Sequence, residues 1–458
     1  MQEHVQLDQK QINEDLLKGV LRTPKWWLPS TLLLTVIFLT GMGAFGYMLN
    51  KGVGVTGLNR PVFWGVFMVN FVFWIGISHA GIMISAILRL TQAEWRRPIT
   101  RAAEVMTVFS LMAALMAAPL VHVGRPWRAD LWVFPYDFAR GIWINIRSPF
   151  IWDPSAVMTY LTASSLFVLV ALLPDLAVIR DRSTGLRKTA YAFLCLGWRG
   201  TPRQWKLQAV AGILLSALVL PVFVSVHSIV SWDFAVQIGT EGWHSTIFAP
   251  YFIIGAIHSG VSAVATIMVL MVWLWGWGNY IRAAHLDAIG RLLIIVAVTW
   301  FFFFFLEWVF ALYTLESPEV ALRELQVFQW PWSGLFAFFI ITAFVFPVSM
   351  WLFKKVRRSF FWMFVTTLSV NVGMWLERFL IIVPGTMRKQ PFLFDWGSYH
   401  PSIIEILMVA MTFAWVLLGL LLFSKVFPLI PLFDIKEGMV GRSVIKIGRR
   451  TVPASIRE

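Results

Sequence analysis

Long apolar segments separated by short polar connections dominate the sequence after its first 27 residues. A helix that crosses a membrane needs about 20 consecutive apolar residues. Ten segments meet this requirement, and they cover residues 28–48, 61–90, 100–121, 154–174, 206–230, 247–277, 289–313, 332–353, 359–383 and 402–427. We therefore expect ten transmembrane helices. The interrupted stretch 183–198 is expected to form an interfacial helix or a loop.

Two sequence motifs recur at nearly the same offset. A phenylalanine, two glycines and a histidine in the second segment return in the sixth segment 179 residues later, as Phe73, Gly76, His79, Gly81 and Phe252, Gly255, His258, Gly260. A tryptophan and a serine at the start of the fourth segment return at the start of the eighth, as Trp152, Ser155 and Trp330, Ser333. The chain therefore contains an internal repeat of four predicted helices.

The even number of helices in the repeat gives both halves the same orientation. We expect an all-α integral membrane protein with two parallel four-helix bundles, helices 2–5 and 6–9, flanked by helices 1 and 10. The expected parts are a cytoplasmic N-terminal segment (1–27), the first helix with an outer loop (28–60), the first bundle (61–230), an outer connection (231–246), the second bundle (247–383), an outer loop with the tenth helix (384–427) and a cytoplasmic tail (428–458). Parallel repeats also occur in transporters, so the repeat alone does not give the function.

Basic residues concentrate in alternate connections. The connections that would lie inside if the N-terminus is cytoplasmic hold Arg96, Arg97, Arg180, Arg182, Lys354, Lys355, Arg357 and Arg358. The connection 231–246 holds neither lysine nor arginine. Since lysine and arginine are enriched on the cytoplasmic side of membrane proteins, both termini are expected in the cytoplasm. The expected membrane is the bacterial inner membrane.

Composition supports a membrane protein and narrows its chemistry. The chain is 58% hydrophobic and 14% charged, whereas a soluble domain is about 25% charged. The net charge of +14 is explained by topology and anionic headgroups, so nucleic acid is not expected as a partner. Because Cys195 is the only cysteine, the chain cannot hold an internal disulfide or a cysteine-ligated iron–sulfur cluster.

Ionisable residues inside the predicted helices concentrate toward the outer side. They are His122, Asp153, His227, Asp233, His258, Glu307, Glu377 and Arg378, with His79 deeper in the second helix, whereas the inner half holds few such groups beyond Glu104 and Asp175. A quinol that is oxidised releases two protons, so its site needs hydrogen-bond acceptors and a proton exit. A histidine and a carboxylate can fill these roles. His122 and Asp153 flank one outer connection and suit them.

Each of these residues also has a structural alternative. His79 and His258 lie beside glycines and could bond across a tight helix contact, or could ligate a b-type haem. Asp153 before Pro154 could cap a helix N-terminus. Glu377 and Arg378 could form ion pairs with neighbouring helices for structure alone. His122, His227 and Asp233 could be interfacial residues.

Three short motifs together resemble a known family. They are NFVFWIGISHAG at 70–81, HVGRPW at 122–127 and IWDPSA at 151–156. With the repeated four-helix halves, the chain resembles the NrfD/PsrC family of polytopic membrane subunits, and within it the ten-helix plan is most similar to ActC of alternative complex III.

The resemblance implies a quinol-oxidising subunit that binds menaquinol or ubiquinol near the periplasmic face and holds no metal or haem itself. It implies quinol deprotonation by His122 and Asp153, with His79, His258 and Arg125 as further quinol-binding candidates. It also implies partners: a periplasmic iron–sulfur subunit, a multihaem cytochrome c, a second NrfD-like subunit and small membrane subunits.

Coupling to proton translocation would require a path across the membrane. The candidates are His79, Glu104, His227, Asp233, Glu307, Glu377 and Arg378, with Ser85 between His79 and Glu104. Two other functions stay open: a secondary transporter with parallel repeats, and a non-catalytic membrane anchor for redox subunits.

Overall fold

The computed structural model describes residues 9–123, 149–388, 396–440, 444–447 and 450–453. Within these ranges, ten helical spans are long and apolar enough to cross a membrane, which confirms the predicted number. They are α2 (Trp27–Lys51), α3 (Gly65–Leu90), α4 (Thr100–Val123), α6 (Pro149–Arg182), α8 (Pro202–Ile238), α9 (Phe248–Trp275), α10 (Ala283–Thr314), the joined α12 (Trp332–Ile340), η6 (Ile341–Val345) and α13 (Phe346–Trp351), α15 (Phe360–Met387) and α16 (Ile403–Val426).

Shorter elements lie at the two ends of these spans. They are α1 (Gln9–Leu21), η1 (Val53–Val55), η2 (Glu94–Arg96), α7 (Gly185–Leu194), η5 (Trp277–Asn279), α11 (Ser317–Phe328), α14 (Lys354–Arg357) and α17 (Leu432–Val440). Helix α7 lies in the stretch expected to be an interfacial helix or a loop. A short antiparallel hairpin of β1 (Val444–Ile447) and β2 (Arg450–Pro453) adds to an otherwise helical fold.

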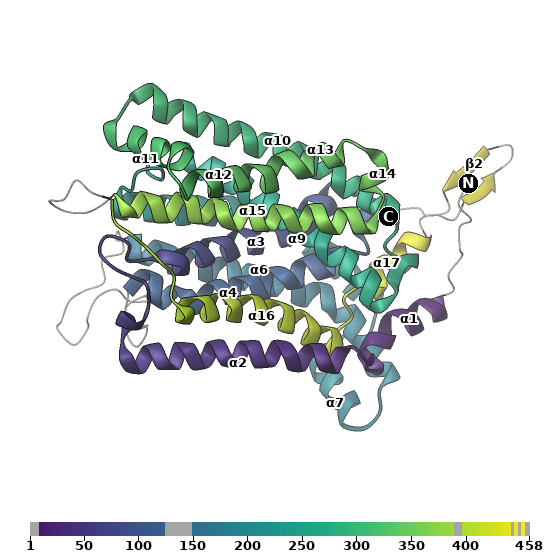
Figure 1. Cartoon of the computed structure of the whole chain (residues 1–458). Coiled ribbons are helices and arrows are strands. Elements are labelled where there is room, and N and C mark those ends of the chain that lie inside the picture. Colours follow the sequence, from purple (N-terminus) through teal and green to yellow (C-terminus); the bar gives the residue numbers. More distant parts are fainter. Residues whose placement is uncertain (1–8, 124–148, 389–395, 441–443, 448–449, 454–458) are drawn as a thin grey trace.

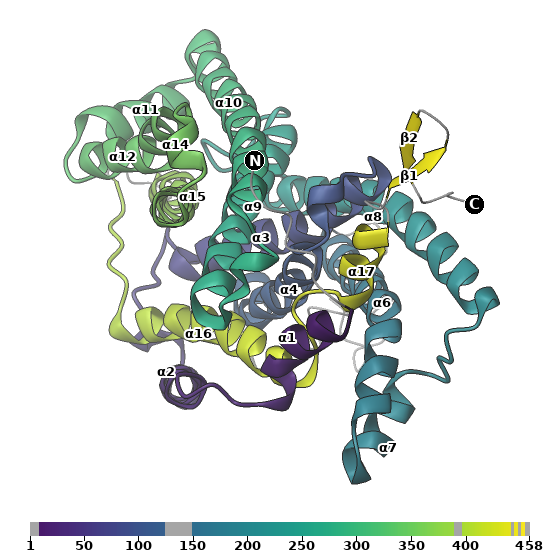
Figure 2. The same cartoon turned by 90° about the vertical axis from the view of Figure 1, so that its right-hand side faces the viewer.

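The molecule has two distinct ends along its helix axes (Figure 1). One end carries α1, α7, α14 and α17, and we call it the terminal end. The other carries α11 and is called the far end. In the view from the terminal end, α2 lies on the periphery and α7 projects from the body (Figure 2).

Helix α3 lies at the centre of the packing. In its most apolar window 94% of the residues are buried, compared with 17% for α2. It contacts α4 and α8 on one side and α9 and α15 on the other. Helices α6 and α8 pack together, α9 packs against α10 and α15, and α2 packs against α16. We propose that α3, α4, α6 and α8 form one repeat and that α9, α10, α12–α13 and α15 form the other.

Two glycines of the repeated motif allow the closest helix contacts. A Cβ atom on Gly260 of α9 would lie 2.0 Å from the Cβ of Ala80 of α3. A Cβ atom on Gly81 would lie 2.2 Å from the carbonyl oxygen of Ala103 in α4. Small residues at these positions let the backbones approach, as in other membrane helix pairs.

Several expected helix boundaries were wrong. Helix α8 continues to Ile238 instead of ending at 230, and α10 begins at Ala283 instead of 289. Helix α6 continues through Pro174 to Arg182 instead of ending at 174. An interior proline removes one backbone hydrogen bond, but the turn beyond it is held by packing, because Leu176 and Ile179 are buried. The same helix begins at Pro149, so Asp153 lies inside it and is not its N-cap.

Candidate functional site in buried polar clusters

A histidine pair occupies the middle of the first group of helices. The rings of His79 on α3 and His227 on α8 have centroids 5.0 Å apart. Tyr160 on α6 stacks on His79 at 4.3 Å with 14° between the ring planes, and its hydroxyl donates to the His79 carbonyl at 3.2 Å. All three side chains are fully buried. The sequence indicated both histidines as candidates but not that they meet.

The hydrogen bonds of the pair fix which ring nitrogens carry protons. His79 donates from Nδ1 to the Ile75 carbonyl at 2.5 Å, and His227 donates from Nε2 to the Phe252 carbonyl at 3.0 Å. In a neutral imidazole the second nitrogen is then an acceptor. Within the described residues, His79 Nε2 and His227 Nδ1 have no hydrogen-bond partner. The pair therefore places two buried lone pairs in one core, and each can accept a proton or a hydrogen bond.

Asp153 lies on α6 toward the far end from this pair. It precedes Tyr160 by seven residues, which places the two side chains on one helix face about 10 Å apart along the axis. Like Tyr160, Asp153 is fully buried. His122 belongs to the last turn of α4, but its side chain is outside the described residues, as is all of Arg125. The pairing of His122 with Asp153 therefore stays a prediction.

Glu377 and Arg378 lie side by side on α15 in the second group of helices. Their side chains form an ion pair at 3.1 Å. Glu377 also accepts hydrogen bonds from the Tyr251 hydroxyl and from Trp300 Nε1 at 3.1 Å. The Arg378 guanidinium lies 4.0 Å from the ring centroid of Phe252. Because the Phe252 carbonyl is the acceptor for His227, this cluster adjoins the histidine pair.

His258 occupies the position in α9 that His79 occupies in α3, but it has different contacts. Its Nε2 donates to the Ala343 carbonyl at 3.0 Å, and its ring stacks on Trp300 at 5.6 Å. Ala343 belongs to the π-helical turn η6, and such turns are frequent at functional sites. His79 contacts His227 instead, so the two repeat-related histidines have different neighbours.

Glu307 of α10 belongs to a third cluster at the far end. It accepts a hydrogen bond from Ser245 at 2.6 Å and lies 3.8 Å from Arg323 of α11, which also lies 3.8 Å from Glu319. A cavity of about 330 Å³ opens beside these residues. The sequence missed Arg323 and Glu319 because they stand in a connection between predicted spans. Asp233, on α8, is fully buried toward the same end.

The terminal end also holds buried charges, and these include Arg101, which the sequence had not indicated. Glu104 accepts a hydrogen bond from Ser85 at 2.5 Å. Arg101 pairs with Asp175 at 3.2 Å, and both side chains are at most 2% exposed. Asp175 in turn accepts from the backbone N–H groups of Leu432 and Phe433 at the start of α17. In the sequence, arginines at helix ends were interpreted only as topology signals, so this cluster was not predicted.

Within the part of the chain that the structure describes, no three His, Cys, Asp or Glu side chains are grouped so that they could hold a metal ion. The clusters are instead built from hydrogen bonds and ion pairs between neighbouring helices. Such clusters can bind polar groups and can hold or move protons.

Comparison with known proteins places this architecture in a family. The family model described as "Polysulphide reductase, NrfD" matches residues 54–389, which include every helix from α3 to α15. The chain belongs to the NrfD family. The match confirms the resemblance drawn from the sequence motifs. The closer similarity to ActC stays a prediction.

Three known proteins are similar to this NrfD-family chain. A putative membrane subunit of dimethyl sulfoxide reductase from Halobacterium salinarum is 28% identical over 245 residues, 53% of this chain and 51% of the relative. An "Hdr-like menaquinol oxidoreductase integral membrane subunit" from Archaeoglobus fulgidus is 23% identical across 89% of this chain and 95% of its own. A selenate reductase subunit from Mesobacillus selenatarsenatis is 21% identical across 88% of this chain and 93% of the relative. The alignment with the first spans about half of that relative's length.

Proposed function

We propose that the chain is a quinol-oxidising membrane subunit of a multi-subunit oxidoreductase of the alternative complex III type. Menaquinol or ubiquinol would bind at the far end, and electrons would pass to an iron–sulfur and haem c partner outside the membrane. The observation that carries the proposal is the fully buried Asp153, which shares one face of α6 with Tyr160. Tyr160 in turn stacks on His79 of the histidine pair. One relative's description as a menaquinol oxidoreductase subunit supports it.

The chemistry of the site follows from the balance of quinol oxidation. A quinol yields a quinone, two protons and two electrons. Asp153 would accept one proton from a quinol hydroxyl, and His122 would accept the other, because a carboxylate and a neutral imidazole are both general bases. Arg125, His79 and His258 remain further candidates for quinol contact. The far end would then face the periplasm of the inner membrane, and both termini would lie in the cytoplasm.

Proton translocation would use the buried groups between the two ends. Glu104 lines the cavity at the terminal end and bonds Ser85, which lies six residues from His79 on α3, or about 9 Å along the axis. The hydroxyls of Thr107 and Ser110 on α4 are buried in the same half. This arrangement supports a route from Glu104 to the histidine pair, and from there through Glu377 and Arg378 toward the far end.

The test is quinol turnover by the intact complex carrying Asp153→Asn. Asparagine keeps the volume of the side chain but cannot accept a proton, so quinol oxidation should fall by about 100-fold while the complex still assembles. Asp181→Asn is the matched control, because Asp181 lies on the same helix with a side chain that is 63% exposed, and it should leave turnover unchanged. Wild-type turnover by Asp153→Asn would reject the proposed role and would favour the membrane-anchor function. Solute flux through the purified chain in liposomes would instead favour a transporter.

A further inference from the structure

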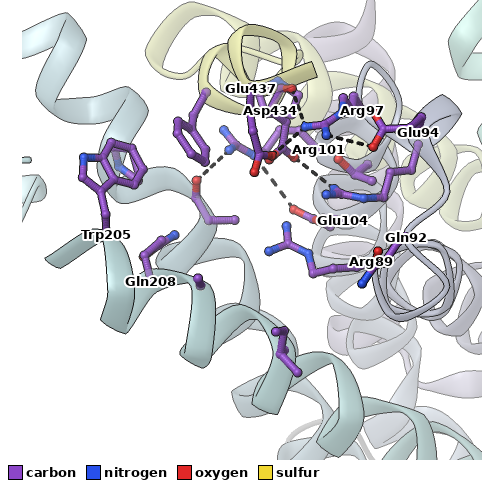
Figure 3. A pocket seen from close by; sticks show the side chains of 18 residues that line it. Arg89, Gln92, Glu94, Arg97, Arg101, Glu104, Trp205, Gln208, Asp434 and Glu437 are labelled. Carbon is purple, nitrogen blue, oxygen red and sulfur yellow. Dashed lines mark hydrogen bonds and ion pairs between the residues drawn. The ribbon is translucent and has the colours of Figure 1, made fainter. Parts of the chain in front are cut away.

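A cavity of about 480 Å³ opens at the terminal end between α3, α4, α6, α8 and α17. Arg89 and Glu104 face it from α3 and α4, and Trp205 and Gln208 face it from α8 on the opposite side (Figure 3). The volume is in the range of small-molecule pockets, which measure about 300–1,000 Å³. The cavity lies at the opposite end of α6 from Asp153, which is not among its lining residues.

The lining charges balance, but Arg89 and Glu104 make no short ion pair among the described residues. Four arginines and four carboxylates line the cavity: Arg89, Arg96, Arg97, Arg101, Glu94, Glu104, Asp434 and Glu437. Arg96 pairs with Asp434, Arg97 pairs with Glu94 and Glu437, and Arg101 pairs with Asp175 behind the wall. Arg89 and Glu104 remain, with no ion pair shorter than the 3.9 Å contact between Glu104 and Arg101 among the described residues.

Several buried polar atoms at this wall have no hydrogen-bond partner within the described residues. They are Nε of Arg89, Nε and Nη1 of Arg101, and Oε2 of Glu104. A buried charged group without a hydrogen bond is costly, and native proteins rarely leave one unpaired. The wall therefore offers donors from two guanidiniums and an acceptor from one carboxylate, all facing one cavity. A ligand that matches it carries an anion and a cation side by side.

One edge of the cavity reaches the apolar exterior of the protein. Ile213 of α8 lines the cavity and is 56% exposed. Its neighbours on the outer surface of α8 are Val210 and Leu214, which are 46% and 64% exposed. These residues belong to a membrane-spanning helix, so this surface faces lipid or another membrane subunit. Phe433 of α17 stacks on Trp205 at 4.2 Å, and both rings line the cavity.

We propose that this cavity binds the headgroup of a zwitterionic phospholipid, phosphatidylethanolamine. The phosphate accepts hydrogen bonds from Arg89 and Arg101, and the ammonium donates to Glu104. The acyl chains leave past Ile213 along the lipid-facing surface of α8. A lone phosphate or an anionic lipid satisfies the guanidiniums but leaves Oε2 of Glu104 without a hydrogen bond and beside a second negative charge, so the balanced lining favours the zwitterion.

The experiment measures lipid retained by the purified complex. The complex is extracted in mild detergent, and bound phospholipid is counted by native mass spectrometry after titration with phosphatidylethanolamine, phosphatidylglycerol or inorganic phosphate. Wild type should retain phosphatidylethanolamine in preference to the other two. Arg89→Gln and Glu104→Gln should each weaken retention about tenfold or more, as expected for the loss of one charge-assisted hydrogen bond. Arg203→Gln changes an exposed arginine at the start of α8 and should retain the lipid as wild type does.

A second variant avoids the buried charges. Ile213→Trp fills the lipid-facing mouth of the cavity from a partly exposed position, so it should assemble normally and lose the lipid even if Arg89→Gln fails to fold. Equal retention by Ile213→Trp and wild type overturns the proposal. Equal or better retention of phosphatidylglycerol or inorganic phosphate overturns it as well, because the ligand would then be a simple anion. Quinol turnover is not the readout, so the outcome is independent of the proposed function.

Discussion

The imidazole of His79 and that of His227 meet edge to face at the centre of the protein, with their ring planes at 71°. Each ring uses one nitrogen to bond a backbone carbonyl of α3 or α9. The other nitrogen of each has no partner among the described residues. A proton that enters this core from either side can therefore be accepted without breaking an existing hydrogen bond.

Replacing His79 by phenylalanine should lower quinol turnover by about 100-fold, the usual contribution of a proton-accepting side chain. Phenylalanine keeps a ring that can stack on Tyr160 but has no nitrogen lone pair. Turnover is measured with the intact complex in proteoliposomes. Phe223→Leu is the control, because Phe223 contacts the His79 ring at 5.6 Å and has no titratable group. Equal losses in the two variants would mean that the ring acts only through packing.

Substitution of the repeated glycines by alanine should lower stability where the glycine touches a neighbouring helix and should leave it nearly unchanged where there is space. Gly81→Ala and Gly260→Ala place a methyl group 2.2 Å or less from a neighbouring helix, and overpacking of this kind costs about 1–3 kcal/mol. Gly76→Ala is the matched control in the same motif, because its Cβ would lie 3.6 Å from the nearest atoms, an ordinary contact. Thermal stability in detergent is the measurement. If Gly76→Ala were as harmful as Gly81→Ala, helix approach would not explain the motif.

Asp175→Asn should be strongly destabilising. It leaves the Arg101 guanidinium buried without its 3.2 Å partner, and breaking a buried ion pair costs about 3–5 kcal/mol. Asp181→Asn on the same helix should cost less than about 1 kcal/mol, because the Asp181 side chain is 63% exposed and solvent screens its pair with Arg180. Unfolding is followed in detergent by titration with denaturant. The double variant Arg101→Met with Asp175→Leu should be more stable than Asp175→Asn, and the reverse order would contradict a charge effect.

Glu405→Gln should destabilise the far end of the protein. Glu405 is fully buried and accepts hydrogen bonds from the Gly57 amide, the Ser402 amide and the Tyr399 hydroxyl at 2.7–2.8 Å. Burial and the bond to Glu405 raise the pKa of Tyr399 above its ordinary value, so the hydroxyl remains a donor at physiological pH. Removing the carboxylate charge should cost about 1–3 kcal/mol of stability, measured by thermal unfolding. Glu316→Gln, at an exposed side chain of the same end, should have little effect.

The transmembrane helices were predictable because few backbone conformations are stable inside a membrane. Every buried amide and carbonyl must be bonded within the chain, so an apolar run of sufficient length forms a helix. The errors arose where a local signal was overruled by packing. The fourth segment was expected to end at 174, yet the helix continues because the next turn is fixed by the buried Asp175, Leu176 and Ile179.

The positions of the candidate residues were predictable, but most of their partners were not. An ionisable group in an apolar segment is conspicuous in a sequence, as His79, His227, Glu307 and Glu377 were. Contacts between distant helices depend on rotation and tilt, which hydropathy does not encode. Arg323 was missed for a different reason: it lies on α11, a short helix outside every predicted span.

The most direct test of the account is where a photoreactive quinone attaches to the intact complex. An azido-quinone that competes with substrate is cross-linked under light, and the labelled peptides are mapped by mass spectrometry. We predict labelling at the far end, in peptides from the last turns of α4 or the first turns of α6 around Asp153, and loss of this labelling in the presence of excess quinol. Labelling confined to other helices, or none that quinol prevents, would contradict a quinol site at Asp153.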